Sequence, residues 1–87
     1  MNFCPQNLTA VSKIYFIAED ATGPFRRVVQ IVLLNGNILS FEEKGECAQL
    51  IRWLYDQNIM LATKLENFLN EKDERHLEIL VFKNEKL

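Results

Sequence analysis

Four stretches of the chain are dense in apolar, β-branched and aromatic residues, which suit the pleated surface of a sheet. We predict a strand in each. The first two are separated by a turn cluster that contains Gly23 and Pro24. In the last stretch, both faces of the strand would be apolar, because Leu77, Ile79 and Val81 alternate with Leu80 and Phe82. The predicted strands are residues 11–18, 25–34, 37–43 and 76–83.

The second and third strands are predicted to form a β-hairpin. Asn35 and Gly36 lie between two apolar runs, and both tolerate the positive φ that a two-residue type I′ turn requires. A two-residue turn fixes the register, so Gln30 is expected to face Phe41.

One long stretch, from Glu46 to Asp73, repeats its apolar residues at helical spacing. The residues before and after Asn58 share the same helical phase, and no Gly or Pro lies near it. We therefore predict one continuous helix of about 26 residues. The alternative is a kink or turn at Asn58 and Ile59, with Asn58 as a C-cap. The apolar arc contains Cys47, Leu50, Ile51, Leu54, Leu61, Ala62, Leu65, Phe68 and Leu69.

A continuous helix would place Asn58 inside an apolar heptad stripe, where a buried Asn specifies the register and number of associating helices. Such a helix would be ~39 Å long, too long for a small sheet to cover, so a homodimer is expected. Trp53 and Met60 lie away from the main arc, and such residues are enriched at interfaces. In the other interpretation, Asn58 caps a backbone group and the sheet or the N-terminal segment covers Trp53 and Met60. The predicted interface is Trp53, Met60, Asn58, Arg52 and Tyr55.

The predicted fold is α+β, with a mainly antiparallel sheet of three or four strands packed on one long helix in the order β-β-β-α-β. The 87 residues suit a single domain, with residues 1–10 as a tail and 84–87 as a frayed end. If the last strand joins the sheet parallel to the third strand, the crossover through the helix should be right-handed; the last strand could instead pair with a partner's sheet.

The amino-acid composition narrows the range of possible functions. The net charge is −2, with ten basic and twelve acidic residues, which disfavours non-specific nucleic-acid binding. The alternative function is nonetheless a nucleic-acid-binding regulator with a basic patch shared across a dimer. No apolar run approaches the roughly 18–20 residues that span a bilayer, so no membrane association is expected. The candidate nucleic-acid residues are Arg26, Arg27, Arg52 and Lys64.

Residues with reactive or metal-binding side chains are sparse. Cys4, Cys47 and His76 stand far apart in the sequence, whereas metal sites need several ligands at motif spacing. We expect no metal, no cofactor and no enzymatic activity. Two cysteines without a disulfide pattern, and no secretory signal, indicate a cytoplasmic protein. The sequence therefore predicts a small, non-enzymatic, homodimeric regulatory protein that binds or blocks a larger protein partner.

Overall fold

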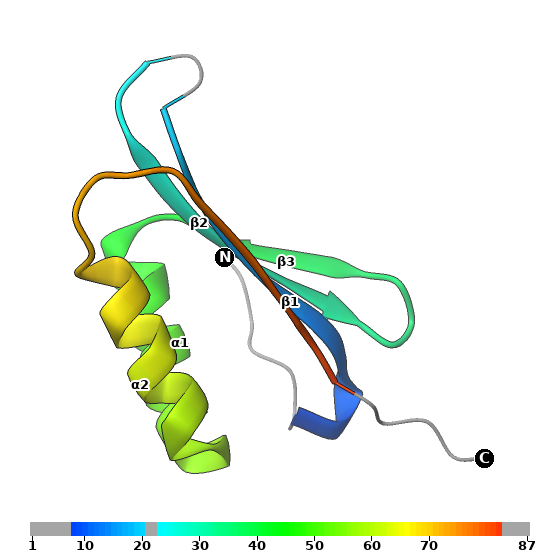
Figure 1. Cartoon of the computed structure of the whole chain (residues 1–87). Helices are drawn as coiled ribbons and strands as arrows, with labels where there is room; N and C mark the ends of the chain where they lie inside the picture. Colours follow the sequence, from blue (N-terminus) through cyan, green and yellow to red (C-terminus); the bar gives the residue numbers. More distant parts are fainter. Residues whose placement is uncertain (1–7, 21–22, 83–87) are drawn as a thin grey trace.

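The computed structural model describes residues 8–20 and 23–82. It has an α+β fold, with a four-stranded antiparallel sheet and two helices that lie side by side on one face of the sheet (Figure 1). The predicted α+β class and mainly antiparallel sheet are confirmed. Of the expected tail at residues 1–10, residues 8–10 form a 3-10 turn with Leu8 packed against the core; residues 1–7 and the expected end at 84–87 lie outside the described residues. The elements are a short 3-10 turn (Leu8–Ala10), β1 (Val11–Glu19), β2 (Arg26–Leu33), β3 (Ile38–Phe41), α1 (Lys44–Gln57), α2 (Ile59–Leu69) and β4 (His76–Val81).

The prediction of one long helix is wrong, because the chain reverses at Asn58. This residue has an extended backbone (φ −165°, ψ 108°) and separates α1 from α2. Its backbone N–H donates to the Leu54 carbonyl, and its side-chain Oδ1 accepts from the Leu61 N–H at 3.2 Å. Asn is a good N-cap residue, so a single residue both ends one helix and begins the next.

The apolar arc is nevertheless the buried face of both helices. Ile51, Leu61 and Leu69 are half-buried against the core. The phase carries through Asn58 because both helices pack on the same sheet, so the arc predicts burial correctly but not the direction of the chain. Six residues of the arc are buried: Cys47, Leu50, Leu54, Ala62, Leu65 and Phe68.

The strand order is β3-β2-β1-β4, and every neighbouring pair is antiparallel. The last strand therefore neither joins the third strand in parallel nor is left to pair only with a partner's sheet, because it pairs with β1 of its own chain. A single crossover helix would have carried the chain to the opposite end of the sheet. The helical hairpin instead returns it to the end where α1 began (Figure 1), so β4 runs antiparallel to β1. Within the described residues no strand pairs with the other side of β4, which we call the free edge.

The β2–β3 register also differs from the prediction. Val29 pairs with Phe41, and Gln30 pairs with Ser40. The loop has three residues rather than two, because the Leu33 N–H donates to the Asn37 carbonyl at 2.8 Å. A shift of one residue exchanges the faces of a strand, and here it moves Phe41 from beside Gln30 into the core, where it is 1% exposed.

Gly36 makes this loop possible. Its N–H donates to the Leu33 carbonyl, and its φ is +93°. No described residue other than glycine has a positive φ, so the expected type I′ turn, which needs positive φ at Asn35 as well, does not form. A type I turn followed by a glycine with positive φ is the usual three-residue hairpin loop.

Candidate functional site: the open face of the sheet

The two faces of the sheet have different surroundings. Ile14 and Phe16 of β1 are 1% exposed and belong to the core beneath the helices. Their neighbours in the strand point to the opposite side, which no helix covers (Figure 1). We call that side the open face. From the strand registers, its apolar residues are Tyr15 and Ile17 of β1, Val28 and Val32 of β2, Ile38 of β3, and Leu77, Ile79 and Val81 of β4.

Several of these apolar side chains are exposed to solvent. Leu77 is 67% exposed, Val81 63%, Ile38 57% and Ile79 45%. The open face of an antiparallel sheet usually carries polar residues. Here Lys13, Gln30 and Ser40 lie among the apolar residues, and the charged pair Glu19 and Arg26 lies at one end of the face. An exposed apolar surface of this kind is typical of an interaction site.

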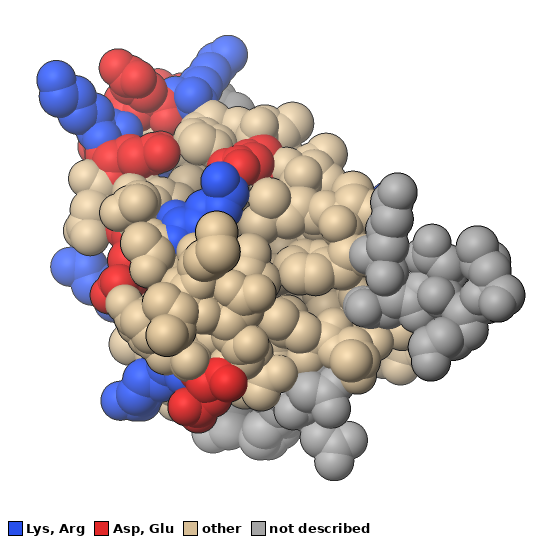
Figure 2. Space-filling view, turned by 60° about the horizontal axis from the view of Figure 1, so that its bottom comes forward, with Lys and Arg blue, Asp and Glu red and all other residues tan. Residues whose placement is uncertain are grey.

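Figure 2 shows one side of the molecule, on which uncharged residues form a broad area. Many of the Lys, Arg, Asp and Glu side chains in this view lie along its left side, and others lie near its centre and at its lower edge.

The backbone of β4 is also available for pairing. The Phe82 N–H donates to the Ser12 carbonyl at 2.9 Å, which fixes the alternation of the β1–β4 ladder. In an antiparallel ladder, every second residue turns its N–H and C=O toward the neighbouring strand. Leu80 and Glu78 therefore bond to β1. Leu77, Ile79 and Val81 turn their backbone groups to the free edge and their side chains to the open face.

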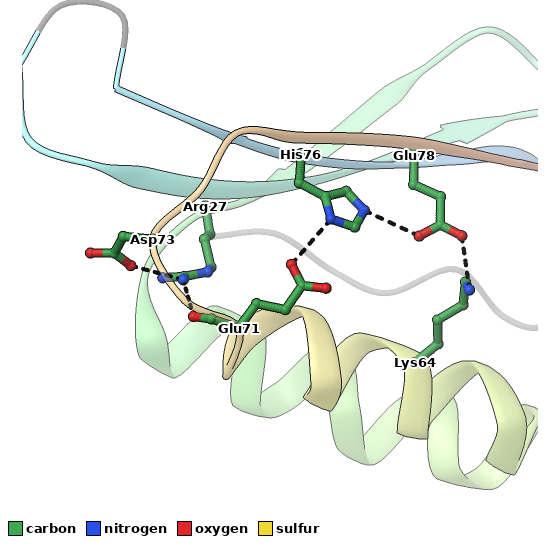
Figure 3. Close-up of polar contacts among 6 residues, drawn as sticks. All are labelled: Arg27, Lys64, Glu71, Asp73, His76 and Glu78. Carbon is green, nitrogen blue, oxygen red and sulfur yellow. Dashed lines mark hydrogen bonds and ion pairs between the residues drawn. The ribbon is translucent and has the colours of Figure 1, made fainter.

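Beneath β4, a chain of polar contacts joins the sheet to α2 (Figure 3). The Lys64 ammonium lies 2.8 Å from the Glu78 carboxylate, and His76 lies between Glu78 at 3.3 Å and Glu71 at 3.1 Å. The hydrogen bond from Lys64, with a further one from His76, lowers the pKa of Glu78. The His76 ring packs edge-on against Phe68 at 5.4 Å. These contacts hold β4 against the end of α2 and the residues that follow it.

The sequence-predicted interface residues do not form one surface. Trp53 is half-buried and packs against the core, which agrees with the interpretation that it is covered. Tyr55 donates a hydrogen bond to Glu66 across the helical hairpin, and this bond raises the pKa of its phenol. Asn58 caps α2. Met60 is 80% exposed, beside the exposed Ile59 at the reversal of the chain, and Arg52 is exposed on α1.

The four candidate nucleic-acid residues are dispersed, and three of them are ion-paired. Arg26 lies 2.8 Å from Glu42, and Arg27 lies 2.9 Å from Asp73. Lys64 is bound to Glu78. Carboxylates compete with phosphate for these cations, so the structure adds no support for the nucleic-acid alternative.

A hollow of about 450 Å³ lies where the first half of α1 and the last residue of α2 meet the start of β2. Its wall includes Arg27, Lys44 and the buried Cys47. The Arg27 guanidinium is held by Asp73 and by the Glu71 carbonyl at 2.5 Å. Burial raises the pKa of the Cys47 thiol, with a smaller contribution from Glu46, which keeps the thiol protonated and weakly nucleophilic.

Residues 8–20 and 23–82 contain neither a cluster suited to a metal ion nor a helix suited to span a membrane. No group of three or more His, Cys, Asp and Glu side chains is arranged to hold a metal ion. No helix in these ranges has the length and apolar character needed to cross a membrane. Cys4 lies outside the described residues.

The sequence contained one signal for the open face, namely a last strand that is apolar on both sides. Because the sequence left open which strand β4 neighbours, Leu77, Ile79 and Val81 were not predicted as candidate site residues. Comparison of the chain with known protein families, curated proteins and solved structures found no match.

Proposed function

We propose that this chain is a small, non-enzymatic regulatory protein that binds or blocks a larger protein partner through the open face of its sheet. The observation that carries the proposal is the exposure of four large aliphatic side chains on that face: Leu77, Ile79, Val81 and Ile38. Burying apolar surface releases about 25 cal/mol per Å². A partner that covers these side chains therefore gains affinity from each of them.

The experiment is affinity capture from cells of the source organism with matched variants. Leu77→Thr combined with Val81→Thr removes apolar surface from the open face and retains residues that favour strands. Ile59→Thr combined with Met60→Thr removes a similarly exposed apolar pair at the reversal of the chain. A partner captured by the wild type is then purified, and its Kd is measured for each variant.

We expect the sheet variant to bind at least about tenfold more weakly, which corresponds to about 1.4 kcal/mol. The helix variant should bind like the wild type. Loss of binding in the helix variant alone would move the interface to α1 and α2 and contradict the proposal. Urea unfolding of both variants checks that each remains folded.

A further inference from the structure

The free edge of β4 suits a second copy of this chain. We propose that β4 pairs antiparallel with β4 of a second copy around a two-fold axis at Ile79, which joins the two four-stranded sheets into one. This inference rests on the proposed function, because it uses the same β4 residues, and it names one partner of that surface.

The edge itself provides the first argument. Soluble proteins protect an edge strand with charges or proline on it, or by making it very short. The opposite edge, β3, has only four residues, whereas β4 has six. On its open-face side, β4 carries only Leu77, Ile79 and Val81. Glu78, the acidic residue of β4, points toward the helices and is paired with Lys64. An edge strand of this length whose open-face side is apolar is a template for another strand.

The register provides the second argument. If Ile79 faces Ile79 of the second copy, Leu77 faces Val81 of the second copy, and the reverse pair follows by symmetry. All three pairs exchange backbone hydrogen bonds, because these residues point their backbone groups to the free edge, for a total of about six bonds. All three cross-strand pairs on the open face are aliphatic, which favours pairing.

Neighbouring symmetric registers are less favourable. A register centred on Glu78 would place two Glu78 carboxylates opposite each other, and like charges directly opposite are destabilising. In this register only two residue pairs would exchange backbone hydrogen bonds between the two β4 strands, for a total of about four bonds. A register centred on Leu80 loses the same number of bonds. The register centred on Ile79 therefore has the most hydrogen bonds and no facing pair of like charges.

The paired dimer would present a longer open face. The β4 side chains of the two copies would meet at its centre, and Ile38 would lie on the far edge strand of each copy. The outer parts of this face would remain available to a larger partner. Self-association through β4 and binding of another protein are therefore compatible.

The test is sedimentation equilibrium of the full chain over a concentration series from about 10 to 500 µM, where mass action makes a weak dimer visible. The wild type is expected to reach the mass of two chains. Ile79→Lys and Ile79→Glu should each be monomeric, because each places two like charges at the axis. An equimolar mixture of these two variants should form a dimer again, because opposite charges then face each other.

The outcomes separate the alternatives. A monomeric wild type at the highest concentration would overturn the proposal. A dimer that persists in both single variants, or a mixture that stays monomeric, would also overturn it, because either result places self-association away from Ile79. Ile38→Lys, at a similarly exposed aliphatic residue on β3, is the control and should dimerise like the wild type.

Different results contradict the proposed function and the proposed dimer. A wild type that stays monomeric, but whose partner binds Leu77→Thr with Val81→Thr more weakly, would leave the proposed function intact without the dimer. If the dimer forms as described but Leu77→Thr with Val81→Thr binds every captured partner like the wild type, self-pairing is supported and the proposed function is contradicted.

Discussion

At the scale of single residues, Asn58 decides the path of the chain. Its backbone N–H closes the last turn of α1 and its side chain caps the first turn of α2. An amide in an apolar arc is compatible with either a buried polar residue in one helix or a cap between two. The sequence pattern alone does not distinguish them, because the same residues are buried in both arrangements.

Replacing Asn58 with alanine tests this role. Loss of an N-cap lowers the free energy of unfolding by about 1 kcal/mol, so Asn58→Ala should be destabilised in urea unfolding. Asn58→Asp, which retains a capping oxygen, should be close to the wild type. A continuous helix would give the opposite sign, because alanine has the higher helix propensity and removes a polar group from the apolar arc.

At the scale of elements, hairpins and helix ends were predicted less well than the strands and the buried helical faces. Asn35 and Gly36 correctly mark the turn, but they fit both a two-residue and a three-residue loop. The longer loop is selected by packing, because it places Phe41 and Leu39 on the side of the core. Local turn signals carry no information about that contact.

Two glycine substitutions separate the requirements of the hairpin loop and the helix. Gly36→Ala should lower the free energy of unfolding by about 1–2 kcal/mol, because its φ is +93°. Gly45, in the first turn of α1, has no such φ, and Gly45→Ala should raise stability by up to about 1 kcal/mol. Since a Cβ at either position meets no atom within 4 Å, both effects are conformational. Urea unfolding measures both changes in the free energy of unfolding. Changes of the same sign in the two variants would contradict the different backbone conformations of Gly36 and Gly45.

The ion pair between β4 and α2 predicts a dependence of stability on pH. The pKa of Glu78 is lowered by Lys64 and then by His76. The contribution of the pair is therefore present above the unfolded pKa of about 4.3 and is lost as the pH falls through the folded pKa. For a partly exposed pair it amounts to about 0.5–1 kcal/mol. Glu78→Gln should lose this stability at pH 7 and show a shallower decline between about pH 5 and 3.

The control for this measurement is Glu74→Gln. Glu74 makes no ion pair within the part of the chain that the structure describes. Its removal should leave both the stability at pH 7 and the acid decline unchanged. A similar loss in both variants would mean that net charge, not the contact with Lys64, sets the response to acid.

At the scale of the whole molecule, the sheet order decides which residues become a surface. The sequence predicted a last strand with two apolar faces but left its neighbour open. Only the reversal at Asn58 returns β4 beside β1, and this places Leu77, Ile79 and Val81 at an edge. Predicting one continuous helix through Asn58 therefore also led to the wrong location for the candidate site.

Amide hydrogen exchange, followed by NMR, should reveal this edge. In a dilute sample, the N–H groups of Glu78 and Leu80 should be protected by their bonds to β1, and those of Leu77, Ile79 and Val81 should exchange rapidly. At high concentration, the second set should become protected if β4 pairs with a second copy. Rapid exchange of Glu78 and Leu80 in all samples would contradict the β1–β4 ladder itself.

The pairing of β1 with β4 also has a consequence for biosynthesis. Lys13 and Val81 are partners in the sheet, yet almost the whole chain separates them, and pairings between such distant segments form slowly. On the ribosome, the first three strands and both helices are made before β4 exists. During that interval β1 has no partner strand on the side where β4 will pair. The nascent chain can therefore pair with β4 of another, completed molecule. Domain swapping is thus the main hazard of producing this protein at high local concentration.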